Sequence, residues 1–174
     1  VPNGTPGYTQ APRYRKMGWH ASDTRELSFV DCHVPESNLV GERGRGYGQF
    51  LQVLTGGRIC VAALSVGLAQ GAFEQSVRYA TQRRAFGRPI GEYQAVKHRL
   101  ADAWTGLEFA RHLPFAAALS PPGDAAASAV LASAALAACA EAGYEAARTA
   151  LQLHGAIGYT DEYDLAVYFK KIRA

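Results

Sequence analysis

The spacing of apolar residues changes once along the chain, near Gly41. Before that point, residues 13–19 and 26–34 carry β-branched and aromatic side chains in partial alternation with polar ones, which predicts short strands. After it, apolar residues recur at intervals of three and four, which predicts helices. We therefore expect residues 1–41 to belong to a β-domain and residues 42–174 to form a helical domain.

A long helix is predicted between Gly41 and the loop of residues 85–91, which contains a proline. Its apolar residues occupy two faces, and such a helix is expected to be buried between neighbours. The first face carries Phe50, Leu54, Val61, Leu64 and Leu68, and the second carries Ile59, Ala63, Val66, Phe73 and Val77.

Three further helices are predicted in the rest of the chain. One begins near Glu92 and is disturbed at Pro114, and the SPPGD stretch of residues 120–124 is a break. An alanine-rich segment then favours a long helix up to about His154, and a last helix follows the turn of residues 155–160. Four helices with short connections favour an antiparallel four-helix bundle. The apolar stripe of the second helix consists of Val96, Leu100, Ala103, Leu107 and Ala110.

Composition narrows the range of functions. A hydrophobic content of 48% over 174 residues is enough for a core. The net charge of +3 and the pI of about 8.8 fall well short of the basic surface of a nucleic-acid-binding protein. The five histidines lack the spacing of a metal site, and no apolar run reaches membrane-spanning length without an interruption. Cys32, Cys60 and Cys139 are far apart in apolar surroundings, which indicates reduced thiols in a cytoplasmic protein.

One stretch between the first two helices, QRRAFGRPIGEYQ at residues 82–94, concentrates arginine and glycine. A guanidinium such as that of Arg83 matches the oxygens of a diphosphate, and Gly87 would let the backbone approach a ligand closely. In the structural alternative, Arg83 and Arg84 are a solvated helix C-terminus and Phe86 is a hydrophobic cap. From this stretch alone, the structural alternative is the stronger of the two.

Four stretches, taken in order, resemble the acyl-CoA dehydrogenases: KMGWHASDTRELSFVDCHVP, the region of Arg58, YATQRRAFGRPIGEYQ and QLHGAIGYTDEY. The resemblance runs from Arg13 to the end of the chain. It implies a mainly α fold, namely an antiparallel four-helix bundle preceded by a few β-strands from an incomplete β-barrel domain. The implied activity is FAD-dependent desaturation of an acyl-CoA thioester between its α and β carbons. The implied partners are further copies of the chain, in a dimer or tetramer, and an electron-transfer flavoprotein as electron acceptor.

The resemblance assigns two segments to the FAD of a neighbouring subunit. In the first segment, Arg83 and Gln94 would contact the cofactor, and Phe86 would pack against it or against the neighbouring subunit. The second segment would line the adenosine end of the cofactor with Gln152, Leu153, His154, Gly155 and Ala156.

The second segment also has a structural alternative. Gly155 follows the alanine-rich helix and would serve as its C-cap, a role that is compatible with cofactor binding. Ala156 stands where the family has a second glycine, and it adds one methyl group where the backbone would approach the cofactor.

Arg58 matches the family's arginine beside the CoA thioester tail, and Thr55, where the family often has an acidic residue, would be its neighbouring contact. An arginine on a helix with two apolar faces is unfavourable unless it is paired or faces a polar cleft. Burial alone does not separate a cleft from an ion pair inside the bundle, for which Glu74, Glu108 and Glu141 are the candidate partners.

Desaturation needs a carboxylate that removes the α-proton. The resemblance places this glutamate either beyond Ala174 or just before the conserved arginine, where this chain has Gly57. The base therefore stays unassigned, and these 174 residues alone are expected to be inactive. The last helix also departs from the family, with Val167 and Lys171 in the places of an arginine and an aspartate.

Three functions remain open at this point. The first is an acyl-CoA dehydrogenase of fatty acid metabolism. The second is a relative that uses the same flavin site as an oxidase or monooxygenase, which the altered last helix favours. The third is a helical oligomerisation module that binds no cofactor.

Overall fold

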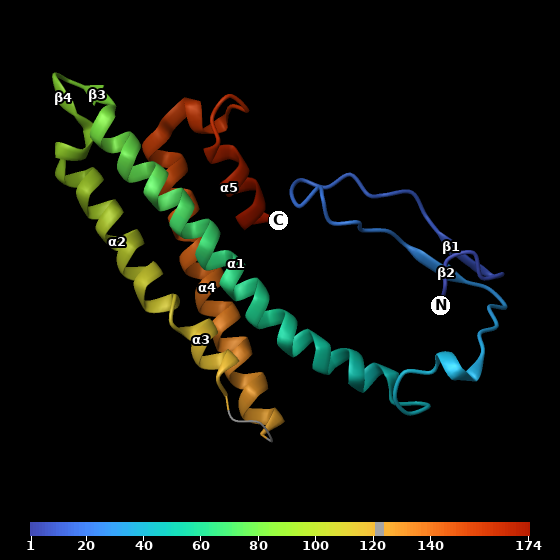
Figure 1. Ribbon diagram of the computed structural model, residues 1–174. Coiled ribbons are helices and arrows are strands. Elements are labelled where there is room, and N and C mark those ends of the chain that lie inside the picture. The colour runs from blue at the N-terminus through green and yellow to red at the C-terminus, as the bar shows by residue number, and fades with distance from the viewer. Residues whose placement is uncertain (121–123) are drawn as a thin grey trace. The chain divides into compact units, whose positions relative to one another are not determined.

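The computed structural model describes residues 1–120 and 124–174 (Figure 1). These residues form two compact units, Val1–Val53 and Leu54–Ala174, which we call the N-terminal unit and the helical unit. The two units divide within the first long helix, whereas the predicted domain boundary at residue 41 lies just before that helix. The domain assignment made from the sequence stays a prediction.

Two short strands pair in the N-terminal unit. Strand β1, Tyr8–Gln10, is antiparallel to β2, Leu27–Phe29. Tyr8 lies opposite Phe29, and their rings stack with centroids 5.1 Å apart. A 3₁₀ helix, η1 at Glu36–Asn38, follows. The rings thus fix the register of this small sheet.

The prediction of a strand at residues 13–19 was wrong, whereas β2 does lie within the predicted strand of residues 26–34. The strand that pairs with β2 is the earlier segment β1, and the amide of Ala11 extends the pairing by donating to the carbonyl of Glu26. Alternation of side chains alone does not say which segment will find a partner.

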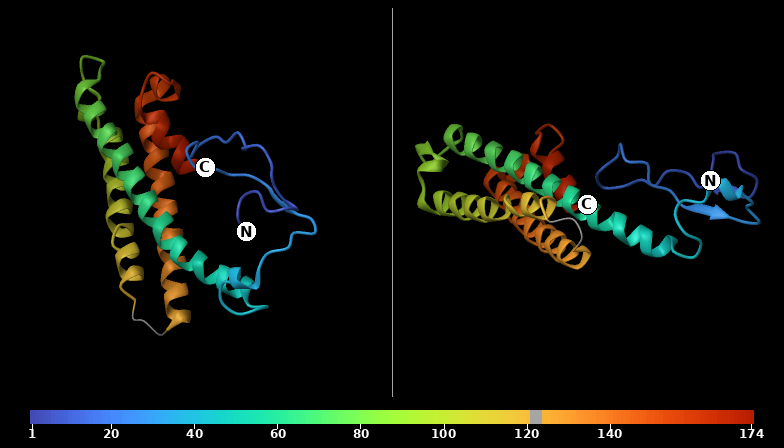
Figure 2. Two further views of the ribbon diagram at one scale, coloured as in Figure 1. Left: turned by 45° about the vertical axis from the view of Figure 1, so that its right-hand side comes forward. Right: turned by 60° about the horizontal axis from the view of Figure 1, so that its bottom comes forward.

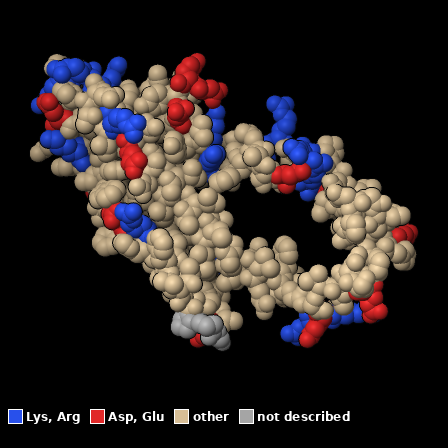
Figure 3. Space-filling model, in the orientation of Figure 1, with Lys and Arg blue, Asp and Glu red and all other residues tan. Residues whose placement is uncertain are grey.

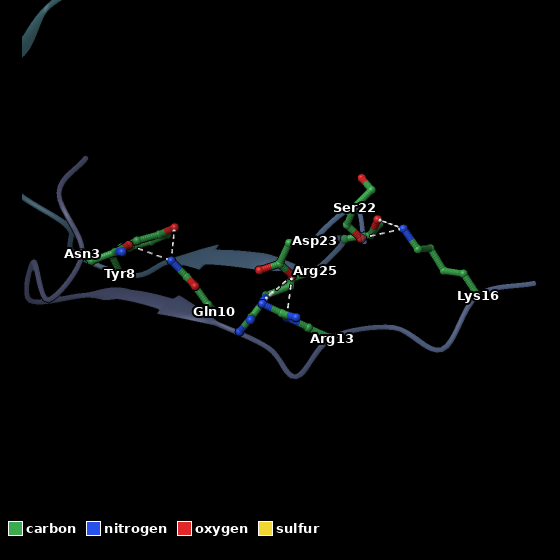
Figure 4. A network of polar contacts seen from close by, with 9 residues as sticks. Asn3, Tyr8, Gln10, Arg13, Lys16, Ser22, Asp23 and Arg25 are labelled. Atoms are coloured by element: carbon green, nitrogen blue, oxygen red, sulfur yellow. Dashed lines mark hydrogen bonds and ion pairs between the residues drawn. The ribbon is translucent and has the colours of Figure 1, made fainter. Parts of the chain in front are cut away.

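Beyond the strands, side-chain polar contacts link the two arms of the N-terminal unit (Figure 4). Asp23 accepts a hydrogen bond from Arg25 at 2.7 Å and forms an ion pair with Arg13 at 3.3 Å. The hydrogen bond from Arg25 lowers the pKa of Asp23. Lys16 donates to the carbonyl of Ser22. All of these groups are accessible to solvent, so they contribute little to stability.

The helical unit consists mainly of helices, and its mainly helical character confirms the prediction from periodicity. The first two long helices were predicted from the spacing of apolar residues, and the third was predicted from its alanine content. The short helix α3, Leu113–Ala118, begins beside Pro114, where the sequence indicated a disturbance. Most of the predicted SPPGD break, residues 121–123, lies outside the described residues. The first helix begins in the N-terminal unit and continues into the helical unit. From this helix onward the elements are α1 Gly46–Gln82, β3 Arg84–Ala85, β4 Arg88–Pro89, η2 Ile90–Glu92, α2 Gln94–Ala110, α3 Leu113–Ala118, α4 Ala125–His154, η3 Gly155–Tyr159 and α5 Leu165–Arg173.

Alanine supplies most of the core of the helical unit. Its small side chain allows helix backbones to approach closely. From one layer of the core to the next, the residue numbers increase in both α1 and α4, so these two helices run in the same direction. The residue numbers of α2 decrease over the same layers, so α2 runs antiparallel to both (Figures 1 and 2). The layers are Ala62 with Ala110 and Cys139, Ala69 with Leu107 and Ala146, and Ala72 with Ala150 and Leu165.

The first predicted apolar face of α1 is mostly exposed, whereas Ile59 and Val66 of the second face are half-buried and pack against the core. The residues of α1 that are buried are Ala62, Ala69, Ala72, Ser76 and Ala80. Several of the large side chains are exposed, because the neighbouring helices of this chain cover mainly the alanine face of α1. These exposed side chains include Phe50, Leu54, Val61, Leu64 and Val77.

The three cysteines are unpaired. Cys139 is buried in the core, where its thiol donates to the carbonyl of Ala110 at 3.4 Å, and burial raises its pKa. Cys60 is exposed, contrary to the apolar surroundings that the sequence predicted for it. A thiol with a raised pKa is unreactive, so Cys139 has a structural role.

Two segments, Gly46–Gln82 and Ala125–Tyr159, are long and apolar enough to cross a membrane by length and composition alone. Within their most apolar windows, 6% and 17% of the residues are buried inside this chain, so the apolar character is mostly on the outside. Helices that pack between neighbours in soluble proteins have the same composition. The absence of a membrane span therefore stays a prediction.

Candidate functional site

A two-stranded hairpin connects α1 to α2, in the stretch that the sequence singled out. Arg84 pairs with Pro89, and Ala85 pairs with Arg88. The two central residues of the turn have positive φ values, 52° at Phe86 and 86° at Gly87, as a type I′ turn requires. Glycine adopts this geometry freely, but a phenylalanine is strained in it.

The side chain of Phe86 is 96% exposed. It therefore caps nothing within the described residues, and the structural alternative for it was wrong. The guanidinium of Arg84 donates to the carbonyl of Gly87 at 2.9 Å, which stabilises the turn locally, and Arg83 is exposed. An exposed aromatic ring on a strained backbone indicates a surface that is shaped for a ligand or another subunit.

Tyr93, at the start of α2, holds the hairpin in place. Its hydroxyl donates to the carbonyl of Ala85 at 3.0 Å, and the guanidinium of Arg88 lies over its ring, 4.1 Å from the centroid. The amide of Ile90 donates to the carbonyl of Arg83 at 2.8 Å. These contacts fix the hairpin against the end of α1 from outside the core.

The second predicted segment forms the end of α4 and the turn after it. Gly155 ends α4 with φ 62° and donates to the carbonyl of Leu151. Gly155 and Ala156 are exposed, and a Cβ added at Gly155 would meet no atom within 4 Å. Gly155 therefore acts as the helix cap and also presents an open stretch of backbone, as the sequence suggested.

Unlike the rest of this segment, the side chain of His154 points into the protein. It is 4% exposed, and its Nδ1 lies 2.7 Å from the carbonyl oxygen of Ala150. The ring stacks on Tyr79 of α1, with centroids 4.3 Å apart, and lies 5.0 Å from the ring of Tyr163. Burial lowers the pKa of His154, and the hydrogen bond with Ala150 partly opposes this. Any contact of His154 with a cofactor would come from its backbone.

The two segments meet at one pocket of about 340 Å³. The structure thus brings together three of the predicted residues, Phe86, Gln152 and Leu153. The hairpin of β3 and β4 and the end of α4 lie at the same end of the helical unit (Figure 1). Arg83 and Gln94 flank this pocket in the sequence but do not line it. The lining is Ala85, Phe86, Ile90, Tyr93, Ala95, Val96, Arg99, Gln152 and Leu153.

The sequence analysis missed Arg99. It lies on the exposed side of α2, one turn after Ala95, and it adds a guanidinium to the pocket. The signal that could have found it is its place in the second turn of α2, one turn after Ala95 and close to the hairpin end of the helix.

Cations gather at this end of the helical unit (Figure 3). Between residues 78 and 99 the only acidic residue is Glu92. A cluster of guanidinium groups suits a diphosphate. The basic residues of this stretch are Arg78, Arg83, Arg84, Arg88, Lys97 and Arg99.

A different pocket, of about 360 Å³, lies between α2 and α4 and is lined by acidic residues. Asp102, Glu141 and Glu145 would repel a diphosphate there. Among the residues that the structure describes, no group of three or more His, Cys, Asp or Glu could hold a metal ion. Arg99 and Gln152 of the first pocket can donate hydrogen bonds to a diphosphate, whereas the carboxylates of the second pocket cannot.

Arg58 lies far from the first pocket, on the earlier part of α1. Its Nη1 donates to the hydroxyl of Ser133 on α4 at 3.2 Å. None of the ion pairs found among the described residues joins Arg58 to the carboxylates proposed for it: Glu108 pairs with Arg111, and Glu74 accepts from Gln70. The ion-pair alternative for Arg58 was therefore wrong. Its neighbour Thr55 is half-buried.

Comparison with known proteins settles the family. The family model of the acyl-CoA dehydrogenase C-terminal domain matches residues 44–174. The chain belongs to the acyl-CoA dehydrogenase family. It is 41% identical over 163 residues to a probable acyl-CoA dehydrogenase, YngJ, of Bacillus subtilis (strain 168), covering 94% of this chain and 43% of that relative.

Solved structures of the family show the same fold. The butyryl-CoA dehydrogenase of Megasphaera elsdenii matches with a TM-score of 0.92 and 35% identity, over 99% of this chain and 45% of that one. A chain in the structure of the electron transferring flavoprotein of Acidaminococcus fermentans matches with a TM-score of 0.91 and 36% identity, over 99% and 45%. The chain thus spans less than half the length of the acyl-CoA dehydrogenases it matches.

Proposed function

We propose that this chain is the C-terminal part of an FAD-dependent acyl-CoA dehydrogenase that desaturates an acyl-CoA thioester between its α and β carbons. The observation that carries the proposal is the pocket that joins Phe86 of the α1–α2 hairpin to Gln152 and Leu153 of α4. Two family motifs that are about 60 residues apart in the sequence thus form one surface, as a shared ligand requires.

The residues around this pocket fit the polar half of FAD. Arg83 and Arg99 would donate to the diphosphate oxygens, and the amides of Gln94 and Gln152 would bond to the diphosphate or the ribose. Phe86 would pack against the cofactor or against the subunit that holds it. When bound, FAD supplies the acceptor for the hydride that leaves the β carbon.

Arg58 and Thr55 would bind the polar tail of the thioester at a different place. Because α1 rises about 1.5 Å per residue, Arg58 lies about 36 Å along the helix from Gln82, where the hairpin begins. One FAD cannot place its reactive ring at Arg58 and its diphosphate at the hairpin of the same chain. We therefore propose that neighbouring subunits complete each active site, in an antiparallel four-helix-bundle dimer or tetramer.

The general base would lie outside residues 1–174. The alternative position is Gly57, which carries no side chain, and the other predicted site residues are not carboxylates. We place the protein in the cytoplasm, in fatty acid metabolism, with an electron-transfer flavoprotein as the electron acceptor. The unpaired cysteines support a reducing compartment.

The full-length gene product tests the proposal. Purified protein should show bound flavin absorbance, and anaerobic addition of an acyl-CoA thioester of suitable chain length should bleach it. Bound flavin that no thioester in a panel of chain lengths bleaches would instead favour a divergent oxidase or monooxygenase, for which Val167 and Lys171 are the sequence evidence. The absence of flavin would favour the oligomerisation module.

Two substitutions separate cofactor binding from assembly. Arg83→Ala and Gln152→Ala each remove a donor from an exposed position and should lower flavin occupancy at least several-fold. Light scattering should give the same oligomer as the wild type. Unchanged flavin occupancy in both variants would contradict the assignment of the pocket.

A further inference from the structure

His154 is the buried polar side chain of the helical unit that is left without a full set of partners. Its Nδ1 interacts with the carbonyl of Ala150, but its Nε2 has no hydrogen-bond partner among the described residues. His154 directly precedes Gly155 in the chain, and Gly155 ends α4. The exposed backbone of Gly155 is part of the proposed cofactor surface. A buried nitrogen that lacks a partner is unfavourable, so it calls for an explanation in terms of function.

We propose that His154 is a positioning residue: its neutral ring holds the Gly155–Tyr159 turn in the shape that binds flavin, and protonation of the ring releases that turn. The proposal rests on the flavin-binding role of this surface given above. It adds a proton-dependent control of cofactor affinity to that role.

The hydrogen-bond geometry determines the tautomer of the neutral ring. A carbonyl oxygen can only accept, so Nδ1 must carry the hydrogen that points to Ala150, and Nε2 is then the bare nitrogen. Protonation would place a new N–H at Nε2, where no acceptor lies. It would also place a positive charge in a site that is shielded from water, which is unfavourable.

The groups that face the ring do not compensate for such a charge. Tyr79 of α1 and Tyr163, which precedes α5, are the aromatic residues that face the ring, and their side chains carry no carboxylate. The faces of the two tyrosine rings attract a cation weakly. In this arrangement, neither tyrosine accepts a hydrogen bond from Nε2. Gly158 of η3 and Leu165 of α5 bring no charge.

Three carboxylates lie near Tyr163 in the sequence, but all are exposed: Asp161, Glu162 and Asp164. Asp161 is already paired with Lys170 at 2.7 Å. In agreement with these surroundings, the pKa of His154 is below its ordinary value of 6.5, chiefly because of burial.

The position of the ring explains why its protonation would act on the turn. Gly158 packs on His154, since a Cβ added at Gly158 would lie 3.2 Å from the Cβ of His154 and 3.3 Å from a methyl group of Leu165. A charged ring can reach water only by leaving the space between the two tyrosines. That movement would displace the end of α4 and disrupt the packing beneath the turn.

The sign of the pH effect follows from the lowered pKa. Because the folded state binds the proton less readily than the unfolded state, the contribution of His154 is complete above about pH 6.5 and is lost as the pH falls through its lowered pKa. Flavin affinity should therefore be constant at neutral pH and fall in acid, by at most about tenfold per pH unit for a single proton.

The test uses the full-length gene product and two variants. His154→Phe keeps a flat ring between the tyrosines but cannot titrate, and His154→Asn keeps a donor for Ala150 but cannot titrate either. His112→Phe, a change at an exposed histidine before α3, is the matched control. If His154→Phe fails to fold, His154→Asn decides the outcome.

Two measurements are made from pH 7.5 down to pH 4.5. The first is hydrogen exchange of the peptide that covers residues 152–163 in flavin-free protein, corrected for the intrinsic pH dependence of exchange. The second is the dissociation constant of FAD from flavin fluorescence. In wild type and in His112→Phe, protection of the peptide should be lost and the dissociation constant should rise in acid. In both His154 variants, the two quantities should stay flat.

An acid response that is the same in wild type and in the His154 variants would overturn the proposal, as would protection that is lost without any change in flavin affinity. If the wild type binds no flavin at pH 7.5, the proposed function fails. The exchange measurement needs no flavin, so it still decides whether His154 controls the turn.

Discussion

The two loops at the cofactor end of the helical unit are held in opposite ways. The α1–α2 hairpin is fixed by contacts on its surface, from the hydroxyl of Tyr93 and the guanidiniums of Arg84 and Arg88. The turn after α4 is fixed from beneath, by the buried ring of His154. Surface contacts can be removed without disturbing the core, whereas the removal of a buried side chain does disturb it. Substitutions in the hairpin should therefore affect ligand binding mainly, and substitutions under the turn should affect stability as well.

The largest expected effect is at Leu165, which is fully buried against Ala72 and Ala150 under the turn. Leu165→Ala should lower the free energy of unfolding by about 3 kcal/mol, because it removes apolar contacts and leaves a cavity. Urea denaturation of the full-length gene product measures this. A loss below about 1 kcal/mol would mean that the turn does not depend on its buried support.

A smaller loss is expected at Gly158. A Cβ there would lie 3.1 Å from a methyl group of Leu151 and 3.2 Å from the Cβ of His154, so both neighbours must shift slightly. Gly158→Ala should lower the free energy of unfolding by about 1.5 kcal/mol and weaken flavin binding at the same time. Gly155→Ala is a useful contrast because there is open space around Gly155, so its cost comes from the positive φ alone. If Gly158→Ala and wild type bind flavin equally well, flavin binding does not depend on the packing beneath the turn.

In the hairpin, Tyr93→Phe removes the hydroxyl that donates to the carbonyl of Ala85 at 3.0 Å and, more weakly, to that of Phe86 at 3.5 Å, and it keeps the ring under Arg88. The free energy of unfolding should fall by about 1 kcal/mol or less, since the bond to Ala85 is only partly buried. Hydrogen exchange should show faster opening of the hairpin without a change in the core helices. If the core helices also exchange faster, the hairpin is not an independent surface element.

The smallest effect on stability, and one of opposite sign, is expected at Phe86. Phe86→Gly relieves the strain of a positive φ and removes a side chain that touches little, so thermal denaturation should show a gain of up to about 1 kcal/mol. Flavin affinity should nevertheless fall. A variant that is both less stable and unchanged in flavin binding would show that the ring packs within its own subunit.

Much of the helical part was predictable because it depends on local spacing. Of the five residues in the predicted stripe of α2, Ala103, Leu107 and Ala110 are buried. Val96 and Leu100 are half-buried. The alanine-rich segment predicted α4 up to His154. The family motifs located both loops, but only the folded chain brings Phe86 into one pocket with Gln152.

Other features depend on tertiary structure and could not be read from the sequence. The periodicity of α1 is apolar on two faces, and nothing in it indicates that the helices would pack through alanine. No local rule places a phenylalanine such as Phe86 at positive φ. The inward direction of His154 results from the two tyrosines that enclose it, which are 75 residues before it and nine residues after it.

The alanine core has a practical consequence for anyone who handles these 174 residues alone. Because the helices meet through their smallest side chains, the bulky apolar ones on α1, such as Leu54, Val61 and Leu64, face solvent in the isolated chain. Exposed apolar surface of this kind promotes self-association and precipitation. A polypeptide of these 174 residues should bind the dye ANS strongly and lose solubility as its concentration rises, and co-expression with the other domains of the enzyme proposed above should restore a clear solution.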